Sequence, residues 1–469
     1  MSSPTPTSAP REVIDLRQRV CIIGAGPAGL SMARALKRRG IAYDQIEKHT
    51  DVGGLWDASN PGSPMYRNCH FVSSKTTSGF FDVPMPEHFA DYPHNRDILG
   101  YTRAFARRFG LYDAIRFNAP ARDVRQDGDT WLVTLGDGEV LRYRAVICCA
   151  GALWEPNLPR HPGVFSGEIR HTVTYKDPQE FQGKRVLIIG AGNSGADIAC
   201  DAAANADRAF ISVRRGYHII PKHVFGVPAD EFSAKGPKLP RWLERPIFTF
   251  ILRYWLVGDV TRWGLPKPDH KLFETHPLLN TQMLHHLQHG DLRAKGAVER
   301  FDGDYVLFKD GSRERIDLVL YATGYKMGLP FVPREYFDWS PGGRPELYLR
   351  AFNRRHHNLF AILVDSNGST FTLFDEMTHM IANYLYDQTT SPQRAAAFKK
   401  LILEDEPDLS GGLKFVKSDR HEAGYVDDHA YRACLAKLRK RMGWPALRPG
   451  YFKTIEVGGD VGQLQGVAA

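Results

Sequence analysis

Two glycine-rich turns carry the clearest chemistry in this sequence. The pattern G-x-G-x-x-G occurs twice, and each copy follows a short apolar run and precedes a helix-like pattern. Glycine permits the tight turn, lets backbone N–H groups approach a pyrophosphate, and leaves the N-terminus of the next helix facing its negative charge. This context predicts a dinucleotide site at each turn. The residues that we expect to bind are Gly24, Gly26 and Gly29 in the first turn and Gly190, Gly192, Asn193, Ser194 and Gly195 in the second.

The residue that ends the second strand of each unit selects the ribose. In the first unit it is Glu47, whose carboxylate accepts hydrogen bonds from a ribose diol and repels a 2′-phosphate. In the second unit Arg214 and Arg215 stand there, and guanidinium groups pair with a 2′-phosphate. We therefore expect FAD or NAD at the first site and NADP(H) at the second, with hydride passing from one dinucleotide to the other.

The elements that position these turns predict an α/β fold with two Rossmann-like dinucleotide-binding domains, the second inserted into the first. Strands are expected at 19–23, 43–47, 185–189 and 209–213, a small antiparallel sheet at 122–141, a hairpin at 304–316, and helices across 383–440. The predicted boundaries are a disordered tail at 1–18, the first domain at 19–165 and 320–469, and the second domain at 166–319. A Pro-, Trp- and His-rich helical insert at about 217–290 is either a substrate lid or a packing element.

The charge balance and the cysteines exclude several classes of protein. The formal net charge of +8 suits anionic cofactors, and the absence of RNP, zinc-finger and helix-turn-helix patterns predicts no nucleic-acid partner. The 6 cysteines include no C-x-x-C pair, so we expect reduced thiols in a cytoplasmic protein rather than a dithiol reductase.

His285, His286 and His289 have no carboxylate or cysteine ligand nearby, which predicts no metal site.

The hydropathy pattern predicts a soluble protein. The sequence has no run of about 18 apolar residues, the length that a spanning helix requires. The nearest candidate, 246–258, is short and is interrupted by Arg253. The C-terminal residues 456–469 carry no apolar tail. We therefore expect no stable membrane insertion.

Several motifs accompany the glycine turns in a fixed order. Residues 53–56 read G-G-L-W, 165–175 match F-x-G-x-x-x-H-x-x-x-Y through His171, and 321–325 read Y-A-T-G-Y. Together they resemble the flavin-containing monooxygenases, within the class B flavoprotein monooxygenases, over about residues 19–385. Tyr175 ends the long motif where Baeyer–Villiger monooxygenases usually carry Trp, so the chain is nearer to the heteroatom oxygenators.

The resemblance implies FAD on the first domain, NADPH on the second, and an activity similar to N,N-dimethylaniline monooxygenase. NADPH reduces the flavin, O₂ adds at C4a, and the (hydro)peroxyflavin oxygenates a soft nitrogen or sulfur centre of a small organic substrate. The family suggests a homodimer. It also adds cofactor-binding residues to those of the glycine turns, namely Gly54, Leu55, Trp56, Val72, Ser73, Asp197, Thr323 and Gly324.

One position departs from the family. Counted back from 83–86, the place of an active-site Asn falls on Val72, which cannot donate a hydrogen bond. Ser73, Ser74 or Lys75 could supply a donor instead, as could Asn68 or His70 with a shifted loop. Ser73 and Lys75 are taken as catalytic candidates, and His171 is a third, with a role in coupling nucleotide binding to geometry. The departure leaves two alternatives open, which are Baeyer–Villiger oxidation of a ketone and an NADPH–flavin reductase that releases H₂O₂.

Overall fold

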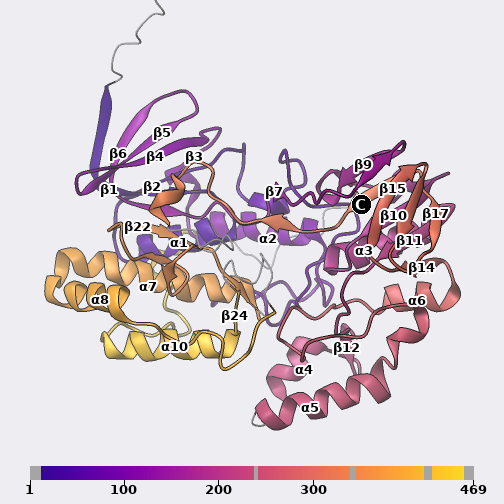
Figure 1. The fold of residues 1–469 in the computed structure, drawn as a ribbon. Coiled ribbons are helices and arrows are strands. Elements are labelled where there is room, and N and C mark those ends of the chain that lie inside the picture. The colour runs from indigo at the N-terminus through magenta and orange to yellow at the C-terminus, as the bar shows by residue number, and fades with distance from the viewer. Residues whose placement is uncertain (1–11, 237–240, 338–344, 367, 417–424, 459–469) are drawn as a thin grey trace, which may run out of the picture.

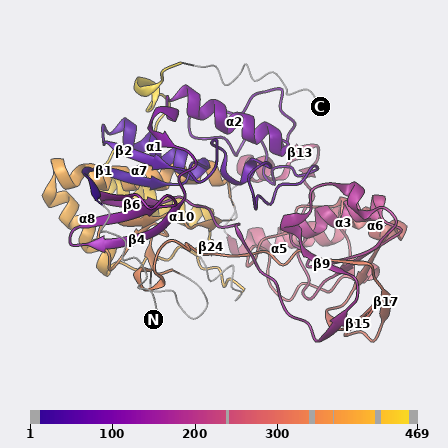
Figure 2. The same ribbon diagram turned by 90° about the horizontal axis from the view of Figure 1, so that it is seen from above.

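The computed structural model describes residues 12–236, 241–337, 345–366, 368–416 and 425–458, which form two α/β units side by side (Figure 1). The N-terminal and C-terminal thirds of the chain share one unit, and the middle third forms the other, as Figure 2 shows from above. This arrangement confirms the predicted fold class of two Rossmann-like domains, with the second inserted into the first.

The first unit is built on a nine-stranded sheet. Its central strands are parallel, with β1 (Val13–Ile23) between β2 (Tyr43–Ile46) and β6 (Val140–Cys148). The order along the sheet is β20-β21-β22-β6-β1-β2-β3, and β4 and β5 extend from β6 as an antiparallel pair. The remaining bounds are β3 Ile115–Arg116, β4 Ala121–Asp127, β5 Thr130–Leu135, β20 Leu347–Tyr348, β21 Phe352–Asn353 and β22 Leu359–Ala361.

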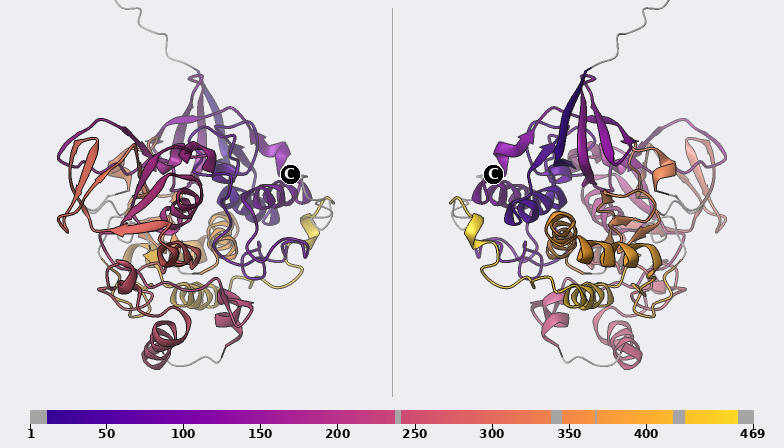
Figure 3. Two further views of the ribbon diagram at one scale, coloured as in Figure 1. Left: turned by 90° about the vertical axis from the view of Figure 1, so that its right-hand side faces the viewer. Right: turned by 90° about the vertical axis from the view of Figure 1, so that its left-hand side faces the viewer.

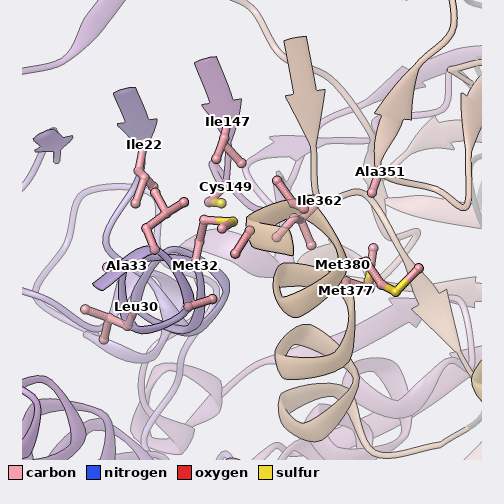
Figure 4. Close-up of a cluster of buried hydrophobic side chains, with 14 of the residues drawn as sticks. Ile22, Leu30, Met32, Ala33, Ile147, Cys149, Ala351, Ile362, Met377 and Met380 are labelled. Carbon is pink, nitrogen blue, oxygen red and sulfur yellow. The ribbon is translucent and has the colours of Figure 1, made fainter. Parts of the chain in front are cut away.

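Helices cover this sheet and bury its apolar strands. In Figures 1 and 3, α1 (Pro27–Arg38), α7 (Thr370–Thr390), α8 (Pro392–Glu404) and α10 (Asp428–Arg441) lie on the same side of the sheet. Figure 4 shows the core between them, where Ile22 and Ile147 of the strands meet Met32 of α1 and Met377 and Met380 of α7. This core fixes the start of α1 directly after β1, which is where the first glycine turn lies.

The second unit has a five-stranded parallel sheet in the order β14-β11-β10-β18-β9. Alternate side chains of β10 face opposite ways, as strand geometry requires. Val186 and Ile188 pack against α3 and α6, whereas Leu187 and Ile189 pack against a four-stranded sheet. The bounds are β9 Glu168–His171, β10 Arg185–Ile189, α3 Asn193–Asn205, β11 Arg208–Ser212, α6 Gln282–His289, β14 Leu292–Lys295 and β18 Leu318–Tyr321, with β8 Gly163–Phe165, β15 Val298–Gly303, β16 Tyr305–Phe308 and β17 Arg313–Arg315 in the covering sheet.

The chain leaves and re-enters the first unit through two paired segments. β7 (Glu155–Pro156) pairs antiparallel with β19 (Tyr325–Lys326), so the outgoing and returning connections lie side by side. The helical insert, α4 (Ala229–Lys235) and α5 (Arg241–Ile251), lies below the second unit in Figure 1 and reaches the first unit through α4. The remaining helix is α2 (Asn95–Arg108), and the remaining short strands are β12 His223–Val224, β13 Val227–Pro228, β23 Asp365–Ser366 and β24 Tyr425–Val426.

Three predicted boundaries need correction. β1 begins at Val13 rather than 19, so residues 13–16, expected in a tail, pair with β6. No residue of this part of the strand is fully buried, so it lacks the buried apolar run that marks residues 20–23. β18 belongs wholly to the second sheet, so the chain returns after Tyr321 rather than at 320. α7 begins at Thr370 rather than near 383 because its first turns are buried against α1. The predicted tail residues 1–11 lie outside the described residues.

Candidate active site

The first glycine turn is built so that only glycine fits. Gly24 has φ +107°, and an added Cβ would lie 2.5 Å from the Cys149 carbonyl oxygen. A Cβ on Gly29 would lie 2.0 Å from the Gly24 carbonyl oxygen. Gly26 is the N-cap of α1, and no side chain caps that helix start. The free N–H groups of the first helical turn are therefore directed at an anion-binding position.

A second backbone segment crosses this turn. Gly54 has φ +59°, and a Cβ there would lie 3.0 Å from Gly26 Cα. The Gly53 N–H donates to the Ala25 carbonyl oxygen at 3.1 Å, which holds the two segments together. Leu55 and Trp56 follow in a short 3-10 helix, both partly buried. The predicted motif thus lies against the predicted turn.

Glu47 ends β2 beside the same turn. One carboxylate oxygen accepts from the Ala25 N–H at 2.6 Å and the other from the His49 N–H at 3.0 Å. Burial raises the pKa of Glu47, and these backbone bonds oppose that rise. A carboxylate offers about four acceptor sites, so two remain for a ribose diol. His49 Nε2, beside Glu47, is buried without a hydrogen-bond partner in the part of the chain that the structure describes.

The second glycine turn repeats the geometry of the first. Gly190 has φ +109°, and its Cβ would lie 2.5 Å from the Ala322 carbonyl oxygen; for Gly195 the Gly190 carbonyl oxygen would lie at 2.2 Å. Gly192 is the N-cap of α3, without a side-chain cap, and a Cβ there would meet no described atom within 4 Å. Asn193 accepts from the Leu279 N–H at 3.2 Å, and Ser194 is exposed.

The two arginines after β11 differ in their engagement. Arg214 is exposed and has no hydrogen-bond or ion-pair partner among residues 12–236, 241–337, 345–366, 368–416 and 425–458. Arg215 pairs with Asp269, with Nε 3.3 Å from the carboxylate. Exposed pairs of this kind stabilise a protein by about 0–1 kcal/mol. Arg214 is therefore the guanidinium that is free to bind a 2′-phosphate.

The segment around the departing position sits next to Trp56. The Trp56 and Phe71 rings meet edge-on with centroids 5.1 Å apart. Val72 therefore follows a residue that contacts the 53–56 segment, which crosses the first glycine turn. Val72 is 41% exposed, and its side chain offers no donor. Ser73 Oγ accepts from Ser78 Oγ at 2.6 Å.

Lys75 donates to two backbone carbonyl groups. Its Nζ donates to the Glu87 carbonyl oxygen at 2.6 Å and also to the Phe89 carbonyl oxygen. These bonds hold the segment 87–89 beside Lys75. An ammonium group has three donors, and the catalytic role of Lys75 stays a prediction.

His171 links the end of β9 to the Y-A-T-G-Y segment. Its Nε2 donates to the Gly324 carbonyl oxygen at 3.0 Å, and its Nδ1 accepts from the Val173 N–H at 3.1 Å. Burial lowers the pKa of His171, and a neutral ring is what both bonds require. Thr323 Oγ1 donates to the Asn157 carbonyl oxygen in the outgoing connection. These contacts tie together the two segments that join the units.

Sequence reasoning missed a buried polar cluster between the units. The Asp197 carboxylate accepts from Tyr66 Oη at 3.2 Å and from Asn280 Nδ2 at 2.6 Å. Burial raises the pKa of Asp197. Tyr66 and Asn280 belong to no motif, so no local signal identified them. Asp197 was predicted to bind the cofactor, and its described contacts are with these side chains.

Some negative findings apply to the described residues. In that part of the chain, no three His, Cys, Asp or Glu side chains are grouped as a metal site would require. None of the described helices is both long and apolar enough to cross a bilayer.

Comparisons with known proteins agree with this geometry. The family described as "Flavin-binding monooxygenase-like" matches residues 17–420. Flavin-containing monooxygenase 5 of Homo sapiens is 34% identical over 461 residues, which cover 91% of this chain and 84% of that protein. Dimethylaniline monooxygenase [N-oxide-forming] 2 of Pan troglodytes is 31% identical over 341 residues, which cover 68% of this chain and 63% of that protein. The structure of S-allyl-L-cysteine S-oxygenase from Allium sativum, 20% identical, superposes with a TM-score of 0.63 over 94% of this chain and 91% of its own.

Proposed function

The chain belongs to the flavin-binding monooxygenase-like family and is an NADPH-dependent FAD monooxygenase, and we propose that it oxygenates a soft nitrogen or sulfur centre of a small organic substrate. One observation carries the proposal. The two glycine turns have the same constrained geometry, but the side chains that follow them carry opposite charge. Glu47 after the first is a buried carboxylate, and Arg214 after the second is an exposed guanidinium. Such a pair fits two different dinucleotides in one molecule.

The residues of the first unit fit FAD. The N–H groups at the start of α1 would hold the pyrophosphate, beside the Gly54 backbone that crosses the turn, and Glu47 would accept from the ribose diol. Bound FAD supplies the acceptor for hydride and the chemistry that activates O₂. The protein's own task at this site is to orient the ring system and to exclude water from it. Trp56 and Phe71 provide apolar surface for that purpose.

The residues of the second unit fit NADPH. The start of α3 would hold the pyrophosphate, and Arg214 would pair with the 2′-phosphate. Arg215 contributes less because it is already paired with Asp269. His171, held neutral between Gly324 and Val173, keeps the nucleotide unit in register with the flavin unit. It acts by position, since both of its ring nitrogens are occupied.

Val72 favours a second candidate function. Because this exposed side chain offers no donor, the chain lacks the amide that members of the family usually carry at this place. Ser73 is the neighbouring residue whose hydroxyl is able to donate there. Baeyer–Villiger oxidation of a ketone is therefore the alternative, and release of H₂O₂ without a product is the outcome expected if no residue replaces the amide.

One experiment separates these outcomes. The enzyme is supplied with NADPH and ¹⁸O₂, and with a sulfide, a tertiary amine or a cyclic ketone in separate reactions. A sulfoxide or N-oxide containing one ¹⁸O per NADPH supports the proposal. A labelled ester or lactone alone supports Baeyer–Villiger oxidation. Consumption of NADPH with H₂O₂ as the sole product contradicts both.

We also propose that the protein works in the cytoplasm as a homodimer whose partners are O₂ and the small substrate. All 6 cysteines are free and 5 of them are buried, which suits a reducing compartment. The dimer rests on family resemblance. Light scattering of the FAD-loaded protein measures it, and a monomeric mass at micromolar concentration contradicts it.

A further inference from the structure

Asp230, an acidic residue of the helical insert, accepts hydrogen bonds from the turn that follows Val72 and Ser73. Asp230 is the second residue of α4, in the nucleotide unit, and lies 156 positions from Ser74 in sequence. Its Oδ2 accepts from the Ser74 N–H at 2.7 Å, from Ser74 Oγ at 3.0 Å and from Thr77 Oγ1 at 2.5 Å. Ser74 is fully buried. Three donors from one short turn thus converge on one carboxylate oxygen.

The same turn also donates hydrogen bonds to backbone groups of its own unit. The Lys75 N–H donates to the Asp91 carbonyl oxygen at 2.8 Å, and the Phe71 N–H to the Pro93 carbonyl oxygen at 2.8 Å. Both of these acceptors belong to the flavin unit. The backbone between Phe71 and Lys75 therefore has its position set from two directions, by its own unit and by the insert. Only the contact with Asp230 crosses from the insert to Ser74 among the bonds described here.

Neighbouring bonds hold the insert in this place. His223 Nε2 lies 3.0 Å from the Asp91 carboxylate, and Tyr92 Oη donates to the Lys222 carbonyl oxygen. Both bonds involve the segment 91–92, whose Asp91 carbonyl oxygen accepts from the Lys75 N–H. The insert is thus seated on the flavin unit at the point where the sequence departs from the family, and not at a remote surface.

We propose that Asp230 is a positioning residue for the oxygenation reaction, acting through Ser74 to fix Val72 and Ser73 against the flavin. This inference rests on the proposed function and deepens it. Val72 offers no side-chain hydrogen bond to this turn, and the insert supplies the acceptor for both the N–H and the hydroxyl of Ser74. A charged acceptor binds such donors more strongly than a neutral one. Movement of the insert away from the flavin unit would release the turn.

The test compares Asp230→Asn and Asp230→Ala with the matched control Glu231→Gln. Among the residues that the structure describes, the neighbouring Glu231 accepts from the exposed turn residue Thr76, at 3.0 Å, and from Lys235 of its own helix. All proteins are used with FAD bound. Three readouts are taken, which are hydrogen exchange of the peptide containing Ser74, circular dichroism of the flavin in the visible range, and the share of NADPH consumption that ends as H₂O₂.

We expect both Asp230 variants to speed Ser74 exchange by about tenfold, to alter the flavin dichroism, and to raise the H₂O₂ share several-fold. The KM for NADPH stays within about twofold, since Arg214 is untouched. Glu231→Gln matches the unmodified enzyme. If Asp230→Asn lowers the melting temperature yet leaves dichroism and H₂O₂ share unchanged, Asp230 is a structural brace and the proposal is overturned. Should Asp230→Ala fail to fold, Asp230→Asn decides, because it keeps one carbonyl acceptor.

The outcome is separable from the proposed function. If the unmodified enzyme forms no oxygenated product, the proposed function fails, while exchange of Ser74 and the flavin dichroism still report on Asp230. Unchanged exchange and dichroism in Asp230→Asn overturn the positioning role even in an enzyme that oxygenates well.

Discussion

The Glu47 carboxylate lies 2.6 Å from the Ala25 amide nitrogen, so the end of the second strand is bonded directly to the first glycine turn. The group that selects the ribose therefore also shapes the turn that holds the pyrophosphate. A change at Glu47 acts on both parts of the same dinucleotide.

Replacing Glu47 with Gln is expected to weaken FAD binding. The amide loses the charge, and one of its two ends no longer accepts from a backbone N–H. Hydrogen bonds to charged groups contribute about 1.5–3 kcal/mol, which corresponds to a loss of roughly tenfold to a hundredfold in FAD affinity. Titration of the apoprotein with FAD, followed by flavin fluorescence, measures the affinity. An unchanged dissociation constant would place the ribose elsewhere.

Replacing Arg214 with Ala tests the second ribose site. Loss of the free guanidinium is expected to raise the KM for NADPH by about tenfold to a hundredfold while leaving that for NADH unchanged, because only NADPH carries the 2′-phosphate. Arg215→Ala is the matched control, and it should have a smaller effect since Asp269 already engages that side chain. Steady-state kinetics with both nucleotides give the answer. Equal effects of the two substitutions, or an equal loss for NADH, contradict the assignment.

The crossing of two backbones at Gly26 and Gly54 predicts a steric effect. A methyl group at Gly54 would lie 3.0 Å from Gly26 Cα, whereas one at Gly40 would meet no described atom within 4 Å. The two glycines have similar φ angles, +59° and +64°. Gly54→Ala should therefore lose bound FAD on purification, and Gly40→Ala should retain it at a cost of about 1–2 kcal/mol of folding stability. Retention of FAD by Gly54→Ala would mean that the segment can move aside.

Much of this site could be predicted because its signals are local. The glycine turns, Glu47 and Arg214 lie within about 25 residues of one another in each unit, as phosphate and ribose binding by one strand–helix–strand unit requires. The contacts of Asp230 with Ser74, and of Asp197 with Tyr66 and Asn280, could not be predicted. They join residues 156, 131 and 83 positions apart, and single Asp, Tyr or Asn residues carry no periodic pattern.

In the fold too, elements with a local sequence pattern could be predicted, and elements that depend on distant contacts could not. Buried parallel strands such as β10 are continuous apolar runs and are recognisable in the sequence. The first half of β1 was not predicted because none of its residues is fully buried and its only strand partner in the described sheet is β6. Pairing with a distant segment therefore makes it a strand. Its register shifts between Leu16 and Val20, which breaks the alternation that identifies a strand.

A buried histidine predicts how stability depends on pH. His379 is 2% exposed, its Nε2 donates to the Pro445 carbonyl oxygen at 2.7 Å, and burial lowers its pKa to about 4. Between pH 6.5 and 4 the unfolded chain binds a proton that the folded chain does not, so stability present above pH 6.5 is lost as the pH falls. The loss from this group is about 3 kcal/mol. The free energy of unfolding, measured with denaturant at several pH values, should fall less steeply with decreasing pH in His379→Gln than in the unmodified protein. An identical dependence on pH would contradict the lowered pKa.

Val72→Asn tests whether the departing position limits oxygenation. Val72 is 41% exposed, so the amide can be introduced without burying an unsatisfied polar group, and stability should change by less than about 0.5 kcal/mol. The new donor beside Ser73 is expected to lower the share of NADPH consumption that ends as H₂O₂ and to raise the yield of sulfoxide or N-oxide relative to ester. Val72→Thr, of similar shape but with a shorter donor, should give a smaller change than Asn. Product yields and H₂O₂ measured together decide the matter. If Asn raises H₂O₂ release instead, the apolar side chain is itself part of how the pocket excludes water, and Ser73, held by Ser78, becomes the donor to be replaced next.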